Sequence, residues 1–473
     1  EFAKNLAYLV GYPYGCVEQT TSTAFPQIYF GEIAKQIGDE KLQNLNASYN
    51  VQQAINKLQT MQLYNGSLSY WEGGAYESWW GSVYAAHFLT EAQKAGYEVD
   101  SKVLNKLYAY LDTKLARKVT QDYYFWADNE SRIYKPYAPQ EVAYSMYVLA
   151  LAGQANKATM NYYKANLSLL LPDSQYLLAM SYLLIGDNGA SRSVLPAKYE
   201  AAGRMITQFD GSFSSDIRNE AIALNALIDT DPKNPQVEIM ARHLSQQMKN
   251  SRYLNTQENA FGLLALGKLA KKNAGSNTTA TITADGKTYN FTGSALTLRK
   301  EVLGKNVEIK TQGGTLYYYY EMEGLNATGR YVEEDNFLTV RRSFYDRNGT
   351  KINGTTFEQG DLVVVRIDLS AKDAEVPNVV VTDMLPAGFE IENPRLGNVP
   401  GIEWIKDNAN AEHTDFRDDR INIFTTATKT TKSYYYVVRC VSKGTFKLGV
   451  LSADAMYNGE YHSYHGAGEV VVQ

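Results

Sequence analysis

The pattern of apolar residues changes abruptly after residue 272, and this change limits the possible folds more than any other feature of the chain. Between about residues 20 and 272 the sequence reads as one helix after another, and several of these helices are apolar nearly all round, as buried inner helices are. More charged, amphipathic stretches alternate with them at a spacing of roughly 35–60 residues, which is typical of a helical repeat array. From about residue 279 the apolar residues alternate with period 2, as in β-strands. The sequence therefore predicts a helical part followed by an all-β part.

Short strands separated by turn signals fill the second part of the chain. Strands are expected at 338–345, 362–369 and 379–383, and a turn is expected at 346–349. Repeated short strands of this kind indicate a β-sandwich. The helical array, closed on itself, would be an α/α toroid. The residues themselves predict a multidomain α + β fold class, and the resemblance given below implies its division into an α/α toroid, a small β domain and a C-terminal β-sandwich.

Length, charge and cysteine content exclude several classes of protein. At 473 residues the chain exceeds what one core usually organises, so two or three domains are expected. Its net charge of −5 gives no case for nucleic-acid binding, and no stretch approaches the ~18 consecutive apolar residues of a membrane span. Two cysteines exclude a disulfide scaffold. The sequence predicts no cofactor and no metal site.

The segment 11–22 is the one stretch of the chain that carries recognisable reaction chemistry. Cys16 and Gln19 are three residues apart, so on a helical turn they lie on the same side, roughly 5–6 Å apart at Cβ. If the Cys16 thiolate displaces ammonia from the Gln19 amide, the product is an internal thioester, which is a stored electrophile. Pro13 and Gly15 favour a bend before the motif. The positive end of the helix dipole is expected to favour the thiolate.

This segment resembles the thioester motif of the α2-macroglobulin family, and specifically of its bacterial branch, in which the order is Tyr-Pro-Tyr-Gly-Cys-x-Glu-Gln-Thr-Thr-Ser. Animal members carry glycine where this chain has Val17, a departure that bacterial members tolerate. The resemblance implies a thioester-containing α/α toroid over residues 1–272, the C-terminal half of a CUB-like β domain over 273–325, and a terminal macroglobulin-like β-sandwich over 326–473. It also implies that the chain is the C-terminal piece of a longer protein.

The resemblance implies a protease inhibitor rather than an enzyme that turns over. In the family, a protease cuts a bait segment, a lysine amine of that protease attacks the Gln19 acyl carbon, and Cys16 leaves as a thiolate. Target proteases are therefore the implied partners, together with upstream macroglobulin and bait domains that lie outside this sequence. The implied location is the periplasm or cell surface of a Gram-negative bacterium. Membrane attachment is implied only through a lipid anchor at an N-terminus that this sequence does not include.

The resemblance also implies a shield over the thioester. Water must be kept from a thioester until the trap is triggered, and packed apolar groups can exclude it. Bacterial relatives carry a Met-Tyr pair near the chain end, which Met456 and Tyr457 match here, and Tyr457 is the implied lid. Family members that prefer hydroxyl targets use a downstream histidine. This chain has no histidine between His87 and His243, so attack by amines without a protein base is expected.

Other classes of function remain open at this stage. A cysteine hydrolase with Cys16 as its nucleophile requires a histidine within hydrogen-bond reach, and the spacing to Gln19 would then be accidental. A carbohydrate-binding or carbohydrate-processing toroid, with an adhesion-type sandwich attached, would use the aromatic and glycine-rich cluster at 70–81. Otherwise the rings of that cluster are expected to pack around a buried thioester. Cys440, in a strand-like run, is expected to be an inert buried thiol.

Overall fold

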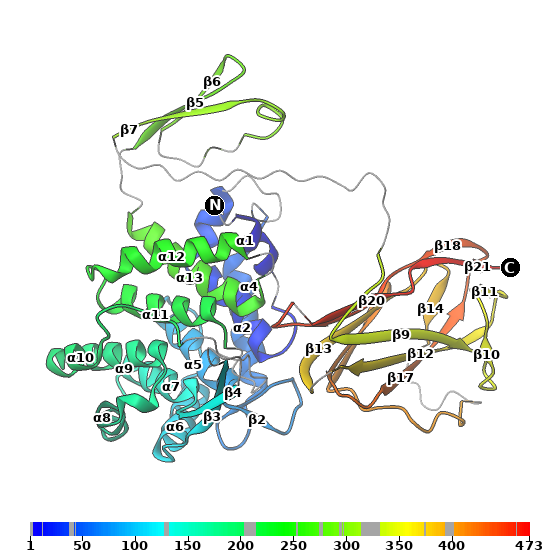
Figure 1. The fold of residues 1–473 in the computed structure, drawn as a ribbon, viewed down its shortest axis with the longest axis horizontal. Helices are drawn as coiled ribbons and strands as arrows, with labels where there is room; N and C mark the ends of the chain where they lie inside the picture. The colour runs from blue at the N-terminus through cyan, green and yellow to red at the C-terminus, as the bar shows by residue number, and fades with distance from the viewer. Residues whose placement is uncertain are drawn as a thin grey trace. The chain divides into compact units, whose positions relative to one another are not determined.

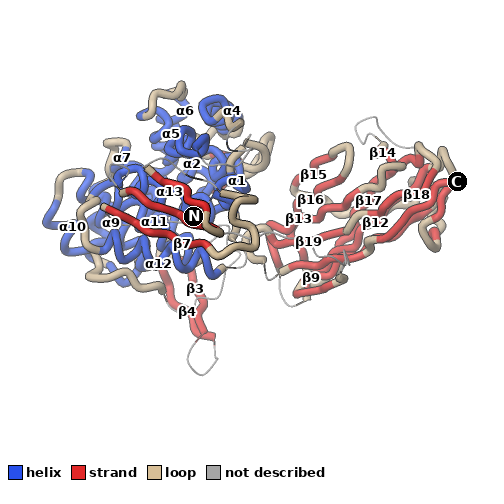
Figure 2. Tube along the Cα trace, turned by 90° about the horizontal axis from the view of Figure 1, so that it is seen from above, coloured by secondary structure: helices blue, strands red, loops and turns tan. Residues whose placement is uncertain are grey.

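The computed structural model divides the chain into two compact units, Glu1–Glu321 and Met322–Gln473, whose elements are drawn in Figures 1 and 2. Each unit has a core of its own. The structure describes residues 3–11, 13–36, 42, 44–126, 132–202, 214–251, 254–273, 278–292, 296, 298–313, 332–372, 375–392, 402–459 and 461–473.

A closed double ring of helices makes up most of the first unit. Each inner helix packs against the next, and the last one returns to the first, so the ring is closed (Figure 1). The inner helices are α2 (Val17–Gln36), α5 (Trp79–Lys94), α7 (Gln140–Leu151), α9 (Pro172–Leu184), α11 (Asp216–Thr230) and α13 (Thr256–Asn273). The outer helices are α1 (Ala3–Leu9), α4 (Ala47–Thr60), α6 (Ser101–Ala116), α8 (Lys157–Ala165), α10 (Asn188–Val194) and α12 (Gln236–Asn250). The predicted α/α toroid is confirmed.

Burial follows from the apolar pattern of each helix. The inner helix α5 is buried at every position from Trp80 to Thr90, whereas the outer helix α12 buries one stripe that includes Met240 and Leu244. Although the inner helices are apolar nearly all round, none of the described helices combines the length and hydropathy that crossing a bilayer requires.

The inner helices all begin at the same end of the toroid. An outer helix returns the chain between successive inner helices, so the inner helices run parallel. Side chains at their first turns consequently meet: Gln140 on α7 donates to Asp173 on α9 at 2.8 Å, and Arg218 on α11 donates to Gln257 on α13 at 3.1 Å. The start of α2, which carries Cys16, belongs to this same end.

Short strands accompany the toroid in the first unit. Two hairpins lie between helices, β1 (Leu68–Ser69) with β2 (Glu77–Ser78) and β3 (Gln121–Trp126) with β4 (Arg132–Tyr137), and a 3₁₀ turn, η1, covers Leu167–Leu169. After α13 a small antiparallel sheet has the order β6 (Lys287–Phe291), β5 (Thr279–Ala284), β7 (Val307–Gln312). Its assignment to a CUB-like domain over 273–325 stays a prediction, and the predicted boundary at 325/326 lies outside the described residues.

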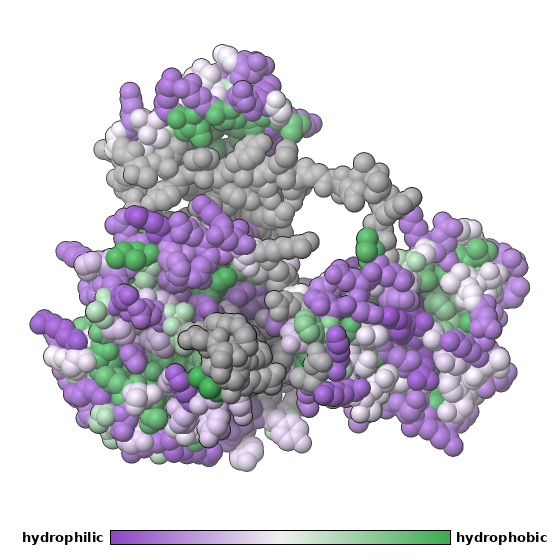
Figure 3. All heavy atoms as spheres, viewed as in Figure 1, coloured by the Kyte–Doolittle hydropathy of each residue, from purple (hydrophilic) through white to green (hydrophobic). Residues whose placement is uncertain are grey.

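The second unit is all β, in agreement with the predicted sandwich. Buried and half-buried side chains alternate along its long strands, so each sheet turns one face to the core. Hydrophilic residues cover most of the face of this unit visible in Figure 3. One sheet has the order β10 (Lys351–Ile352), β9 (Leu338–Tyr345), β12 (Leu362–Ala371), β17 (Lys432–Cys440), β14 (Phe389–Ile391). A second has β15 (His413–Phe416), β16 (Arg420–Ala427), β13 (Val376–Met384), β19 (Leu451–Ala455), β20 (His462–His465), β8 (Glu334–Asn336), and a third has β11 (Thr356–Phe357), β21 (Gly468–Val472), β18 (Gly444–Leu448).

Candidate functional site

Cys16 and Gln19 lie together at the buried start of α2. Cys16 directly precedes the helix and its side chain is fully buried. The side chain of Gln19 folds back toward the helix start, where its Oε1 accepts a hydrogen bond from the backbone N–H of Cys16 at 3.3 Å. A hydrogen-bond donor at this oxygen polarises the carbonyl and would stabilise negative charge that develops there when a nucleophile attacks Cδ.

Gly15 leaves the room into which Gln19 folds. Its φ is +95°, a left-handed conformation that glycine adopts without strain. A Cβ at this position would overlap Oε1 of Gln19 and would lie 3.0 Å from the Gln19 Cδ. The approach of the Gln19 carbonyl to Cys16 therefore depends on the absence of a side chain at residue 15.

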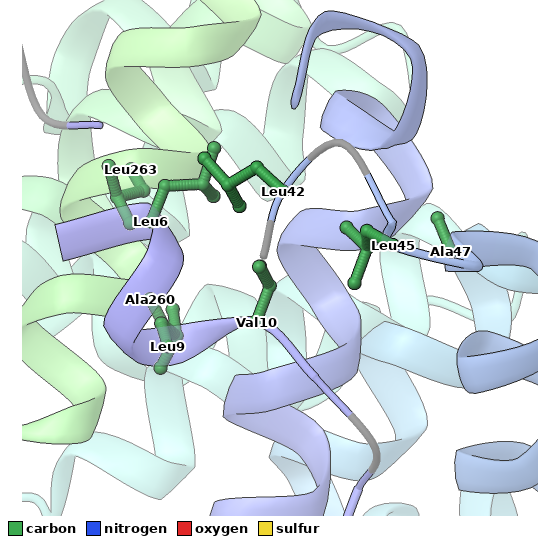
Figure 4. Close-up of a cluster of buried hydrophobic side chains, with 8 residues drawn as sticks. All are labelled: Leu6, Leu9, Val10, Leu42, Leu45, Ala47, Ala260 and Leu263. Atoms are coloured by element: carbon green, nitrogen blue, oxygen red, sulfur yellow. The ribbon is translucent and has the colours of Figure 1, made fainter. Parts of the chain in front are cut away.

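An apolar cluster holds the chain segment that precedes the motif. The end of α1 packs on α13 and on the segment that leads into α4, so residues 6–10 are fixed before the chain turns toward Cys16 (Figure 4). The cluster consists of Leu6, Leu9, Val10, Leu42, Leu45, Ala47, Ala260 and Leu263.

Polar contacts fix both sides of the motif. Lys57, in the last turn of α4, donates from Nζ to the carbonyl oxygens of Gly15 at 2.7 Å and Pro13 at 3.3 Å. On the other side, the buried carboxylate of Glu18 accepts hydrogen bonds from the hydroxyls of Ser22 at 2.6 Å and Thr256 at 3.0 Å. Glu18 thus joins the start of α2 to the start of α13.

The thiol of Cys16 is neutral, contrary to the expectation drawn from the helix dipole. Burial raises its pKa to about 12, and the charge of Glu18 adds to the shift. Hydrogen bonds to the sulfur from the backbone of Gln19, the side chain of Tyr70 and the backbone of Glu18 lower the pKa but do not compensate. Desolvation outweighs the helix dipole here, because burying a thiolate costs more free energy than the positive end of one helix supplies.

The aromatic cluster at 70–81 packs into the toroid end rather than forming an open platform. The carbonyl of Tyr70 accepts from the N–H of Val17 at 2.9 Å, and a Cβ on Gly81 would lie 2.5 Å from Cγ1 of Val17, so this loop and α5 close around position 17. The Lys114 ammonium lies 4.7 Å from the centroid of the Trp79 ring. Trp80 is buried beneath the Arg218 guanidinium at 4.4 Å. Each of these two indole rings therefore carries a cation over one face, and that face is not available for sugar stacking.

Arg218 is the fully buried centre of the polar end of the toroid. Its guanidinium donates to the side-chain oxygens of Gln140, Gln257 and Asn219. Gln140 in turn donates to the buried carboxylate of Asp173. Burial raises the pKa of Asp173 to about 6, and the charge of Arg218 opposes the shift.

Replacing Asp173 by asparagine is expected to remove one pH dependence of stability. Because its pKa is raised on folding, the native state binds the proton more tightly, and stability falls as the pH rises from about 4 to about 6. The free energy of unfolding of Asp173→Asn minus that of wild type should therefore be about 1–3 kcal/mol larger above pH 6 than below pH 4. Urea unfolding across this range measures the difference, with the exposed Asp112→Asn as control. A constant difference between Asp173→Asn and wild type would contradict the assignment.

The histidines of the first unit are engaged away from Cys16. Nδ1 of the buried His87 pairs with the Tyr144 hydroxyl at 2.7 Å, and Nδ1 of His243 pairs with Glu220 at 2.8 Å. Burial lowers the pKa of His87 well below its usual value. Neither ring provides the base that a cysteine hydrolase centred on Cys16 would need in this unit.

The remaining predicted residues belong to the second unit. Met456 and Tyr457 are half-buried in the turn between β19 and β20, where the Met456 N–H donates to the carbonyl of Asn378 at 3.0 Å. Their role as a shield stays a prediction. Cys440 ends β17 and is buried, and burial raises its pKa to about 11. Among the described residues no cluster of histidine, cysteine or carboxylate side chains could hold a metal ion.

Comparison with known proteins agrees with the sequence motif at both ends of the chain. Residues 1–118 match the family model described as the A-macroglobulin TED domain, and residues 338–460 match the bacterial α2-macroglobulin MG10 domain. Both matches point to the bacterial α2-macroglobulin family. Among curated relatives of this family, an α2-macroglobulin of Xylella fastidiosa (strain Temecula1) is 26% identical over 96% of this chain, and that of Escherichia coli (strain K12) is 25% identical over 99%.

The chain spans about 29% of the length of these two bacterial α2-macroglobulins. Solved structures show the same fold over the whole chain. Salmonella α2-macroglobulin reacted with methylamine superposes with a TM-score of 0.75 at 22% identity, covering 100% of this chain and 31% of that one. Native Escherichia coli α2-macroglobulin spanning domain MG7 to the C-terminus gives a TM-score of 0.75 at 21% identity, covering 100% of this chain and 75% of that one. The prediction of a bacterial α2-macroglobulin C-terminal region is confirmed.

Proposed function

We propose that Cys16 and Gln19 form an internal thioester, with which this part of a bacterial α2-macroglobulin traps proteases covalently. The observation that carries the proposal is the position of the Gln19 side-chain carbonyl. It accepts a hydrogen bond from the N–H of Cys16 at 3.3 Å, and it occupies a space that a side chain at residue 15 would fill. Family membership supports the same chemistry. The buried, neutral thiol is suited to storage, because the site excludes water from the bond that would form.

The chemistry has two steps. In the first, Sγ of Cys16 attacks Cδ of Gln19, the C–N bond breaks, and ammonia leaves with the thiol proton. In the second, an uncharged lysine amine of a protease attacks Cδ, the C–S bond breaks, and the electron pair returns to sulfur. The product is an amide bond between Gln19 and the protease and a free thiol at Cys16. The acyl group is consumed, so the chain acts once, as an inhibitor rather than as an enzyme.

The site favours amines over alcohols as nucleophiles. An amine needs no external base, whereas a hydroxyl must lose its proton during attack. In the first unit both histidines are engaged elsewhere, His87 with Tyr144 and His243 with Glu220. Treatment of the chain with methylamine should therefore give a stoichiometric adduct on Gln19, while glycerol should give almost none. Glycerol incorporation that rivals methylamine incorporation would contradict this selectivity.

We further propose Tyr457 as the shield, with Met456 beside it. Replacing Tyr457 by glycine should speed both spontaneous hydrolysis and methylamine attack by about tenfold or more, because water and amine would reach the bond. Tyr457→Phe keeps the ring and should react like wild type. The appearance of the Cys16 thiol with time measures both rates. Equal rates in the glycine variant and wild type would show that Tyr457 does not shield the thioester.

The partners and location proposed for the whole protein follow from its family. Target proteases would be captured after cleavage of a bait segment, and that segment would lie in upstream domains outside this sequence. The periplasm or cell surface, with attachment through an upstream lipid anchor, is the proposed location.

A further inference from the structure

Two polar side chains from outside the thioester motif, Tyr70 and Lys57, contact Cys16 or the residues just before it. Tyr70 contacts the motif twice: its side chain hydrogen-bonds the Cys16 sulfur, and its carbonyl accepts from the Val17 N–H at 2.9 Å. Lys57 holds the segment that directly precedes Cys16, with Nζ on the carbonyls of Pro13 and Gly15.

The position of Tyr70 is fixed by strand β1, which directly precedes it. The N–H of Leu68 donates to the Ser82 hydroxyl on α5 at 2.8 Å, and the N–H of Ser69 donates to the Met61 carbonyl at 3.0 Å. The Ser69 hydroxyl reaches the carbonyl of Trp71 at 2.7 Å. The chain before Tyr70 is therefore tied to α5 and to the end of α4, and the residue after Tyr70 is tied back to Ser69.

The environment of the sulfur makes the departure of a thiolate difficult. The site is fully buried, and the nearby carboxylate of Glu18 repels negative charge, so burial and Glu18 together raise the pKa of the Cys16 thiol to about 12. The positive charge of Lys57 lies on the Gly15 carbonyl, one residue before Cys16, and interacts with the charge of Cys16. Burial lowers the pKa of Lys57, whereas the charges of Glu72 and Cys16 oppose that shift. The Tyr70 hydroxyl at the sulfur and the charge of Lys57 would offset part of the cost of forming the thiolate.

We propose that Tyr70 and Lys57 form the leaving-group site for acyl transfer, an inference that rests on the proposed thioester. Tyr70 touches the reacting sulfur and is a catalytic residue, because its O–H donates to Sγ as the C–S bond breaks. Lys57 is a positioning residue, because it holds the carbonyls of Pro13 and Gly15 and so fixes Gly15 and Cys16 against Gln19.

The step balances without a further reactant. The amine nitrogen bonds to Cδ of Gln19, and charge develops on Oε1 beside the Cys16 N–H. The C–S bond then breaks, its electron pair goes to Sγ, and the Tyr70 O–H stabilises that pair without being transferred. The proton lost by the attacking nitrogen ends on Sγ, which gives a neutral thiol.

The Tyr70→Phe variant of the full chain tests the catalytic role, with Tyr76→Phe as control. Tyr76 lies in the same loop but is 88% exposed. Loss of the hydroxyl should slow methylamine attack and spontaneous hydrolysis by the same factor, about tenfold or more, because both reactions expel the same thiolate. A merely structural role would instead loosen the site and speed both reactions. Unchanged or increased rates in Tyr70→Phe would overturn the proposal.

Lys57 is tested by the fraction of chains that lack one ammonia by intact mass. Lys57→Met should lower this fraction, since the carbonyls of Pro13 and Gly15 lose their anchor, and Lys57→Arg should restore most of it. Lys102→Met, an exposed change in the same unit, should have no effect. A normal fraction in Lys57→Met would overturn the positioning role.

The outcomes also separate this inference from the proposed function. If wild type releases one thiol with methylamine while Tyr70→Phe reacts equally fast, only the leaving-group site is refuted. If wild type itself releases no thiol, the thioester proposal is refuted, and the leaving-group site with it.

Discussion

Replacing Gly15 by alanine is expected to abolish the bond between Cys16 and Gln19. The added Cβ would overlap Oε1 of Gln19 and lie 3.0 Å from Cδ, so the Gln19 side chain could not fold back to Cys16. The variant chain should carry the full translated mass, two reactive thiols, and no methylamine adduct. Intact mass before and after methylamine, together with thiol titration of the denatured chain, measures these three properties.

Gly96→Ala is the matched control for this prediction. Gly96 has a φ of +92°, close to the +95° of Gly15, but no atom lies within 4 Å of the Cβ that alanine would add. Both variants should lose about 1–2 kcal/mol of stability, because alanine is strained in the left-handed region. Only Gly15→Ala should lose the cross-link. If Gly15→Ala still loses one ammonia, the steric role of Gly15 is wrong.

Replacing Asp383 by alanine is expected to destabilise the second unit by about 3–5 kcal/mol. Asp383 on β13 is fully buried, pairs with Arg342 on β9, and accepts from the Tyr436 hydroxyl at 2.7 Å. Removing the carboxylate would leave the buried guanidinium of Arg342 without its counter-charge. Such a loss is a large fraction of the 5–15 kcal/mol that stabilises a typical domain.

Hydrogen–deuterium exchange resolves this effect within the second unit. Backbone amides of β9, β13 and β17 should exchange several hundredfold faster in Asp383→Ala than in wild type. Asp419→Ala, which removes the exposed partner of Arg420, should change exchange by less than a factor of about five. Similar exchange in the two variants would show that the Arg342–Asp383 pair does not hold the sheets together.

The sequence predicted the fold class because the two hydrophobic periods differ so clearly. Helices apolar all round can only be inner helices, and the stretch that became α5 is buried at every position from Trp80 to Thr90. The run predicted as a strand at 379–383 lies in β13 and is buried at every second residue. These signals are local, so a single sequence is sufficient to read them.

The candidate site was only partly predictable. Cys16 and Gln19 share one helical turn, and their spacing alone indicates the chemistry. Lys57, Tyr70 and Arg218 come from segments about 40 to 200 residues away, and only the tertiary packing of the toroid brings them to the same end as Cys16. Nothing in their local sequence distinguishes them from other polar residues. For Tyr70 alone there was a signal, because the aromatic cluster at 70–81 was expected to pack around the thioester.

The expectation of a stabilised thiolate failed for a related reason. A helix start favours negative charge on Cys16, but the depth of burial and the nearby Glu18 carboxylate depend on tertiary packing. That packing outweighs the dipole. A buried site suits the proposed thioester, because it keeps water away from the acyl bond.

Intact mass of freshly prepared chain, with thiol titration of the same sample, tests the Cys16–Gln19 bond most directly. The untreated chain should be lighter than its translated sequence by one ammonia and, once denatured, should titrate one sulfhydryl, that of Cys440. Methylamine should then add its own mass and release the second sulfhydryl. A chain of full translated mass that titrates two sulfhydryls from the outset and takes up no methylamine would contradict the account.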